Sequence, residues 1–63
     1  MIELTLPTMT CGHCVKTVTE TVQRIDPSAR VEADLPTHRV RIETSEPRER
    51  LAAALAEEGY APA

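Results

Sequence analysis

The sequence predicts an α+β fold in which two amphipathic helices cover one face of a four-stranded antiparallel sheet. Two observations support this prediction: some segments alternate apolar and polar residues with the period of a strand, and others repeat apolar residues with the period of a helix. Prolines and a glycine mark the junctions between these segments. No internal repeat or linker interrupts the 63 residues, so we expect a single domain over residues 1–63.

The first strand and the first helix are predicted from different spacings of apolar residues. Apolar and polar residues alternate in MIELTL, and Pro7 ends this strand. Residues 13–25 are rich in valine and threonine, which favour strands. Their apolar residues nevertheless share one helical face, whereas a strand would scatter them over both faces. These residues are Val15, Val18, Val22 and Ile25. We therefore expect a helix over residues 13–25.

The middle of the chain predicts an antiparallel hairpin. RVEADLP and RVRIET both alternate in polarity, and Pro36, Thr37 and His38 form the turn between them. The expected inward positions are Val31, Ala33, Leu35, Val40 and Ile42. The charged positions of the second strand of the hairpin are expected on the solvated face of the sheet. They are Arg39, Arg41 and Glu43.

The last third of the chain predicts a second helix and a short fourth strand. Ser45 is a candidate helix cap, and the helix is expected from about residue 46 to residue 58, ended by Gly59. Its expected buried residues are Leu51, Ala54 and Leu55. The remaining YAPA leaves room for only a stub of a strand, and Pro62 confines that stub to a sheet edge. The resulting order, βαββαβ, is that of the ferredoxin-like fold.

Composition excludes two classes of partner. The net charge is −3, from 10 acidic and 7 basic residues, and Tyr60 is the only aromatic residue. Nucleic acid is therefore not expected as a partner, because neither a basic surface nor a stacking platform is available. No stretch approaches the roughly 18 apolar residues of a membrane span, so we expect no membrane insertion and a cytoplasmic location.

Both cysteines lie in the stretch TMTCGHCV. A reducing cytosol does not favour a structural disulfide, so a close pair indicates metal binding or redox chemistry. We expect Cys11 in the loop after the first strand and Cys14 in the first turn of the helix, where the helix dipole favours thiolates. Two thiolates suffice for Cu(I), whereas a closed structural zinc site usually has four ligands. Cys11 and Cys14 are therefore the candidate ligands of one soft ion per monomer that accepts low coordination, such as Cu(I).

With its βαββαβ order, the sequence resembles the heavy-metal-associated domain over essentially its whole length. The M-x-C-x-x-C motif of that family is met by Met9, Cys11 and Cys14. The resemblance implies a copper chaperone that is not an enzyme and passes Cu(I) to a similar domain of a P-type ATPase. The ending EEGYAPA is similar to that of bacterial members, which implies that Tyr60 lies beside the metal site. Thr8 is a departure, since many members have glycine there.

Other interpretations remain open at this point. The same C-x-x-C spacing occurs in small dithiol redox proteins, and carriers of Hg(II), Zn(II) or Cd(II) share the fold expected here. We expect Met9 to pack inward rather than bind metal, His13 to face solvent, and His38 to serve only as a turn residue. We expect a monomer, with a metal-bridged dimer as the alternative.

Overall fold

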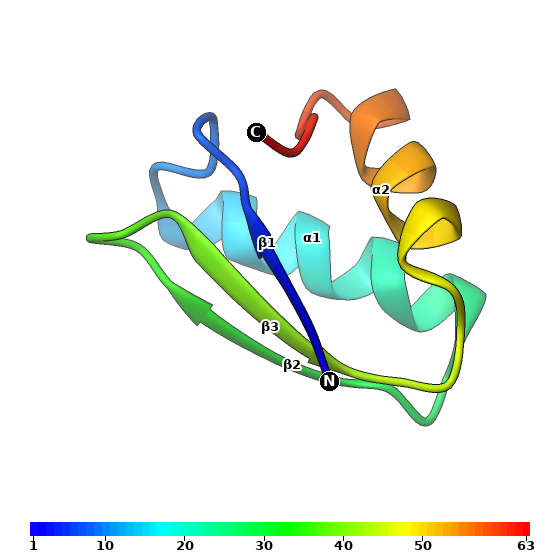
Figure 1. Cartoon of the computed structure of the whole chain (residues 1–63). Helices are drawn as coiled ribbons and strands as arrows, with labels where there is room; N and C mark the ends of the chain where they lie inside the picture. Colours follow the sequence, from blue (N-terminus) through cyan, green and yellow to red (C-terminus); the bar gives the residue numbers. More distant parts are fainter.

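The computed structural model describes residues 1–63 and contains three strands and two helices. In chain order they are β1 (Ile2–Thr5), α1 (Gly12–Ile25), β2 (Arg30–Asp34), β3 (Arg39–Glu43) and α2 (Arg48–Glu57). The strands form one antiparallel sheet in the order β1-β3-β2, and both helices lie on the same face of it (Figure 1). The predicted arrangement of sheet and helices is confirmed, but the number of strands is not.

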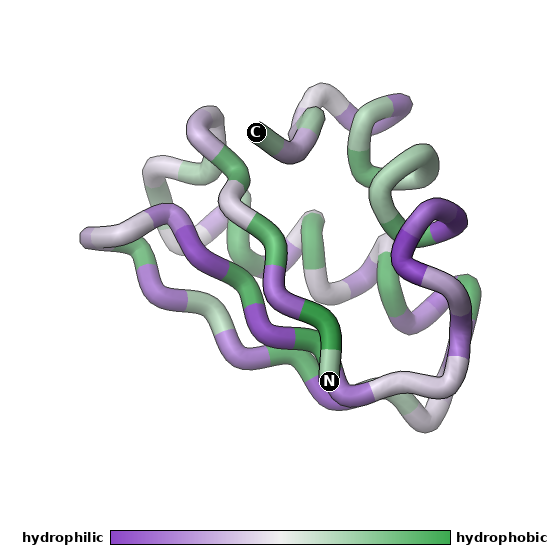
Figure 2. Tube along the Cα trace, in the orientation of Figure 1, coloured by the Kyte–Doolittle hydropathy of each residue, from purple (hydrophilic) through white to green (hydrophobic).

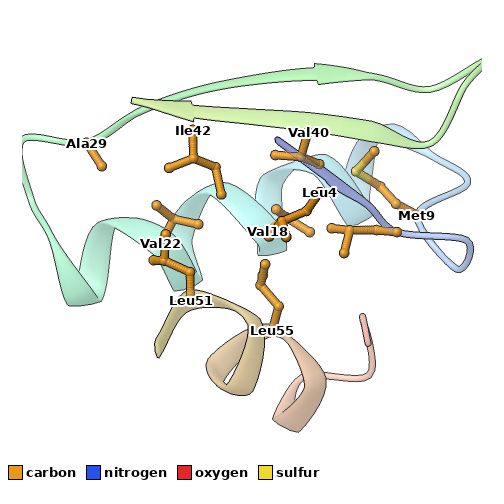
Figure 3. Close-up of a cluster of buried hydrophobic side chains, with 10 residues drawn as sticks. Leu4, Met9, Val18, Val22, Ala29, Val40, Ile42, Leu51 and Leu55 are labelled. Atoms are coloured by element: carbon orange, nitrogen blue, oxygen red, sulfur yellow. The ribbon is translucent and has the colours of Figure 1, made fainter. Parts of the chain in front are cut away.

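The core lies between the sheet and the two helices. Along each strand the hydropathy alternates, as the colouring of Figure 2 shows, because only the face toward the helices is buried. Val22 of α1 lies beside Leu51 of α2, and Val18 lies above Leu55 (Figure 3). The ten buried apolar residues are Leu4, Leu6, Met9, Val18, Val22, Ala29, Val40, Ile42, Leu51 and Leu55.

The valine- and threonine-rich segment forms α1 despite its preference for strands. Val18 and Val22 are fully buried, so the packing of one helical face outweighs local propensity. Three threonine hydroxyls also donate to the carbonyl four residues earlier, at 2.8 to 3.1 Å. They belong to Thr17, Thr19 and Thr21. These bonds satisfy hydroxyls that would otherwise compete for the backbone in non-helical conformations.

The fourth strand that we predicted does not form. One backbone hydrogen bond, 2.8 Å from the Ala63 amide to the Thr5 carbonyl, joins the C-terminal residues to the outer edge of β1. Residues 60–63 make no other backbone hydrogen bond to β1, so they do not form a ladder with it. On the same edge, the Arg48 guanidinium donates to the Glu3 carbonyl at 3.0 Å. A side chain thus takes part of the place that a strand would have filled.

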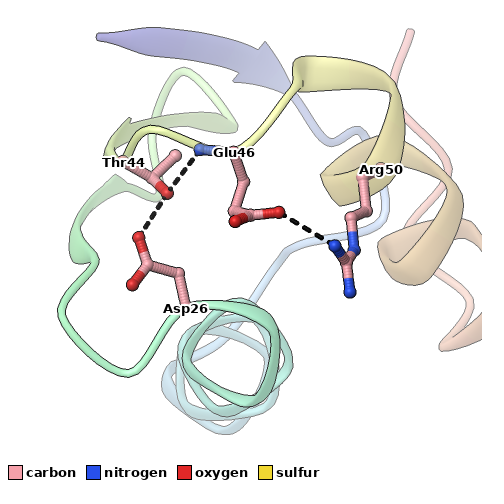
Figure 4. A network of polar contacts seen from close by, with 4 residues as sticks. All are labelled: Asp26, Thr44, Glu46 and Arg50. Carbon is pink, nitrogen blue, oxygen red and sulfur yellow. Dashed lines mark hydrogen bonds and ion pairs between the residues drawn. The ribbon is translucent and has the colours of Figure 1, made fainter.

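The start of α2 also differs from the prediction. The helix begins at Arg48 after Pro47, and Ser45 does not cap it. Thr44 orders the approach instead: its hydroxyl accepts from the Glu46 amide at 3.1 Å and donates to the Asp26 carboxylate at 2.6 Å (Figure 4). A hydrogen-bonded ion pair of 3.0 Å between Arg50 and Glu46 follows. Pro47 is the residue before the helix and not its first residue. Its φ is −64°, but its ψ of 142° is extended and not helical.

Candidate metal centre

The two cysteines lie at the start of α1. Cys11 is the residue before the helix, with an extended backbone (φ −149°, ψ 169°), and Cys14 is in the first turn. Cys11 is exposed, whereas Cys14 is half-buried and packs against the core. Both positions agree with the sequence-based prediction. Both thiols therefore lie at the positive end of the helix, but only Cys14 is part of the helix itself.

The sulfur atoms of Cys11 and Cys14 are 3.1 Å apart. This separation exceeds the length of a disulfide bond, about 2.05 Å, so both thiols are free. It is also shorter than the roughly 3.8 Å between two sulfurs on a tetrahedral metal with metal–sulfur bonds of about 2.3 Å. A metal ion held by both sulfurs would therefore require them to move apart, and a linear two-coordinate ion would require the largest movement.

No third histidine, cysteine or carboxylate joins this pair to make a group of three. His13 lies between the cysteines in sequence, but it is exposed, as predicted. Its carbonyl accepts a hydrogen bond from the Thr17 hydroxyl at 3.1 Å, within the helix. The pair of thiols is therefore not part of a larger group of such side chains.

Cys14 carries the perturbed thiol of the pair. Its pKa is lowered from 9.0 to about 6, first by the Tyr60 hydroxyl and next by the Cys11 thiol. The backbone amide of Thr10 lowers the pKa further, and partial burial acts in the opposite direction. The Tyr60 hydroxyl lowers this pKa by donating toward the Cys14 sulfur, which favours the thiolate. Thiolate is the form that binds metal, and Cys14 reaches this form at neutral pH.

Tyr60 is directed toward the cysteines by the turn that ends α2. Gly59 has φ +90°, a conformation that favours glycine, as predicted for this position. The Tyr60 amide donates to the Leu55 carbonyl at 2.8 Å, and the Gly59 amide donates to the Ala56 carbonyl at 3.1 Å. This is the hydrogen-bond pattern of a Schellman motif. The pKa of Tyr60 is raised, first by its interaction with Cys14 and next by partial burial.

Residues 7–11, called the metal loop below, are attached to the rest of the fold at three points. The Met9 side chain is fully buried, which confirms that it packs inward. The Thr8 hydroxyl donates to the Gly59 carbonyl at 2.9 Å. The Nδ1 atom of His38 lies 2.9 Å from the Met9 carbonyl oxygen. Sequence reasoning missed the last two contacts, because His38 and Gly59 are far from the loop in sequence and no periodic pattern reports such contacts.

The open face of the sheet carries the largest hollow, of about 400 Å³. It is lined by Glu3, Glu32, Ala33, Asp34, Thr37, Arg39 and Arg41. Opposite charges alternate across the strands here: in the register of the sheet, Arg41 lies opposite Glu3 of β1 and Glu32 of β2. Arg39 also forms a 3.5 Å ion pair with Glu3 between exposed side chains. This agrees with the prediction of a solvated face and places no thiol in the hollow.

Neither helix has the length and apolar character needed to cross a membrane.

The sequence matches the model of the heavy-metal-associated domain over residues 3–61. Among curated proteins, none matches the chain. Several solved structures do. One is a gold-binding protein with 39% identity and a TM-score of 0.94, and the match covers 98% of this chain and 95% of that one.

Two further neighbours are copper chaperones. One is Atx1 from Synechocystis PCC6803 in a trimeric form, a histidine-to-tyrosine variant, with 38% identity and a TM-score of 0.96 over 100% of both chains. The other is the cyanobacterial copper metallochaperone ScAtx1, with 37% identity and a TM-score of 0.79 over 98% of this chain and 97% of that one.

Proposed function

This chain belongs to the heavy-metal-associated domain family, and we propose that it is a cytoplasmic metallochaperone that binds one Cu(I) through Cys11 and Cys14. The observation that carries the proposal is the pair of free sulfurs, 3.1 Å apart, at the N-terminal end of α1. The absence of a third ligand in the chain supports a soft ion that accepts low coordination. Copper chaperones of nearly the same structure support the choice of copper.

Binding would replace thiol protons by the ion. Cys14, with a pKa of about 6, is ready to bind as a thiolate at neutral pH. Cys11, exposed and outside the helix, would move to open the distance between the sulfurs. Tyr60 would shield the Cys14 side of the site. The chain would carry the ion as a single domain and a monomer, with two copies bridged by one ion as the alternative, and would catalyse no reaction.

Transfer to a partner would proceed by ligand exchange. A thiol from a C-x-x-C domain of a metal-transporting P-type ATPase loses its proton to solvent and enters as a thiolate, the third ligand on Cu(I). Cys11 then leaves and takes up a proton, and the second partner cysteine replaces Cys14 in the same way. Copper stays Cu(I) throughout, so no electron is gained or lost. Cys11 leaves first because it is outside the helix, whereas core packing holds Cys14.

A competition titration of the reduced protein with Cu(I) and Zn(II) tests metal binding. We expect one Cu(I) per chain, loss of two free thiols, and no displacement of Cu(I) by equimolar Zn(II). The copper-loaded protein is then mixed with a C-x-x-C acceptor domain in the presence of a Cu(I) chelator. Direct exchange predicts a transfer rate that rises with acceptor concentration. A rate equal to escape to the chelator, whatever the acceptor concentration, would mean that the protein is a metal buffer.

Two alternative functions have observations in their favour. The short distance between the sulfurs and the lowered pKa of Cys14 suit a dithiol redox protein. The resemblance to a gold-binding protein suits a carrier of another soft ion, such as Au(I), Hg(II), Zn(II) or Cd(II). Thiol–disulfide exchange with glutathione that is faster than metal exchange would support the redox function. Preference for another ion in the titration would support a different carrier.

A further inference from the structure

We propose that Thr8 and His38 are positioning residues, which hold the metal loop so that only Thr10 and the Cys11 side chain move when metal enters or leaves. The inference rests on the proposed function, since it concerns the rate at which the same site releases its ion. Neither residue is part of the C-x-x-C pair, and neither is placed to bind the metal.

His38 holds the loop from the hairpin between β2 and β3. Its backbone carbonyl accepts from the Leu6 amide at 2.7 Å, and its ring lies 2.9 Å from the Met9 carbonyl. Because a carbonyl oxygen can only accept, Nδ1 must carry the hydrogen in this contact. His38 thus contacts the residue before Pro7 and the residue after Thr8. His38 does this from a left-handed backbone conformation, with φ +59°.

Thr8 holds the loop from the opposite side, where α2 ends. Its hydroxyl donates to the Gly59 carbonyl at 2.9 Å, next to the residue whose ring faces Cys14. The Met9 side chain, fully buried, adds an apolar attachment between the two polar ones. Three successive contacts therefore fix the loop up to Met9.

The attachments stop just before the cysteine. The Thr10 side chain is exposed and makes no hydrogen bond, and Cys11 is exposed as well. From Gly12 onward the chain is helical. The Cys11 carbonyl accepts from the Val15 amide at 3.2 Å, so α1 holds the Cys11 backbone, and what remains free to move is Thr10 with the Cys11 side chain. The sulfurs must separate beyond 3.1 Å for a metal ion to enter, and this segment allows Cys11 to move without disturbing the core.

Removing either polar attachment should lengthen the mobile segment. Thr8→Val deletes the hydroxyl and keeps the shape, and His38→Gly deletes the ring while tolerating the positive φ. Two conservative variants should restore the contacts. Thr8→Ser keeps a hydroxyl, and His38→Asn keeps a side-chain donor on a residue type that accepts this backbone conformation.

The matched control is Thr37→Val. It removes a 2.8 Å hydrogen bond to Asp34 in the same hairpin, but this bond does not reach the metal loop. All variants are compared in the full chain, with thermal unfolding recorded for each. Any general loss of stability is thereby separated from a local effect on the loop.

Two measurements test the proposal, one without metal and one with Cu(I). In the metal-free protein, hydrogen exchange of the Met9 amide, which donates to the Leu6 carbonyl at 3.0 Å, should be on the order of fivefold faster in Thr8→Val and His38→Gly, the effect of losing one hydrogen bond of ordinary strength. Release of Cu(I) to a chelator should accelerate by a similar factor. Thr8→Ser, His38→Asn and Thr37→Val should remain close to wild type in both measurements.

Other results would overturn the proposal. Unchanged exchange at the Met9 amide in both deletion variants would show that these contacts do not hold the loop, and equal acceleration across the whole sheet would indicate a purely structural role. A wild-type protein that fails to bind Cu(I) would instead overturn the proposed function. The exchange measurement on metal-free protein would then still decide whether Thr8 and His38 fix the loop.

Discussion

Cys11 and Cys14 belong to the same turn of the chain but are held differently: Cys11 is exposed before α1, and Cys14 is packed against the core within it. Their sulfur atoms are 3.1 Å apart, so one candidate site contains both an exposed cysteine and a packed one. The Cys14 side chain is supported by core packing and the Cys11 side chain is not, so we expect Cys11 to be the more mobile of the two.

Replacing either cysteine by serine should weaken Cu(I) binding by orders of magnitude, because each removes half of the thiolate ligands. His13→Ala should change affinity little, since His13 is exposed and outside any three-residue ligand group. Competition with a Cu(I) chelator at fixed pH gives all three affinities. A large loss in His13→Ala would identify that residue as a ligand that we have assigned to solvent.

The reactivity of Cys14 should titrate near pH 6, and Tyr60→Phe should move this midpoint upward toward 9.0, because the Tyr60 hydroxyl is the largest cause of the lowered pKa. Alkylation rates followed by mass spectrometry over a pH series give the midpoint for each cysteine. Since folding lowers this pKa, the contribution of Cys14 to stability is present at high pH and is lost as the pH falls through about 6. An unchanged midpoint in Tyr60→Phe would contradict the assigned role of the ring.

Gly59→Ala should destabilise the fold by about 1 kcal/mol or more, because alanine rarely adopts a positive φ. The position has φ +90° and no atom within 4 Å of the added Cβ, so backbone strain alone is responsible. Gly12→Ala is the matched control, since its added Cβ also meets nothing within 4 Å and its backbone is helical. Urea unfolding should show Gly12→Ala to be neutral or up to about 1 kcal/mol more stable. Equal effects at both sites would exclude strain as the cause.

Thr44→Val should destabilise the protein more at neutral pH than at strongly acid pH, where only the lost hydrogen bond from the Glu46 amide remains. The Thr44 hydroxyl is the largest cause of the lowered pKa of Asp26, followed by Ser28, so folding favours the ionised carboxylate. That contribution is present above the ordinary value of 3.8 and is lost as the pH falls through the lowered pKa. The difference in unfolding free energy between variant and wild type should therefore shrink below pH 3.8. A difference independent of pH would point to packing instead.

Most of the fold could be predicted from the sequence because its elements depend on local periodicity. The spacing of Val18 and Val22 outweighed their strand propensity, and the structure buries both. The alternation in β3 likewise predicted the burial of Val40 and Ile42. The failures concern chain ends and caps. A strand at residues 60–63 depends on pairing geometry that four residues with one proline cannot sustain, and the start of α2 depends on Thr44, whose partner Asp26 is 18 residues away.

The candidate site was only partly readable from the sequence. The spacing of Cys11 and Cys14 placed both thiols at a helix start, and the structure has them there. The position of Tyr60 came from resemblance rather than from any pattern in the chain, and its interaction with Cys14 agrees with that placement. The contact of His38 with Met9, 29 residues apart, depends on how the hairpin folds over the loop. A turn residue with no periodic partner gives no sign of such a contact in the sequence.

The outer edge of β1, where no fourth strand pairs, bears on how the protein behaves at high concentration. A bare strand edge is a template for pairing with another chain and so for aggregation. Here the Glu3 carbonyl is occupied by the Arg48 guanidinium, and the Thr5 carbonyl by the Ala63 amide. A charged side chain and a short terminal segment therefore cover acceptors that an incoming strand would need. At this edge of the sheet, the missing strand therefore leaves fewer free backbone acceptors for a second chain to pair with.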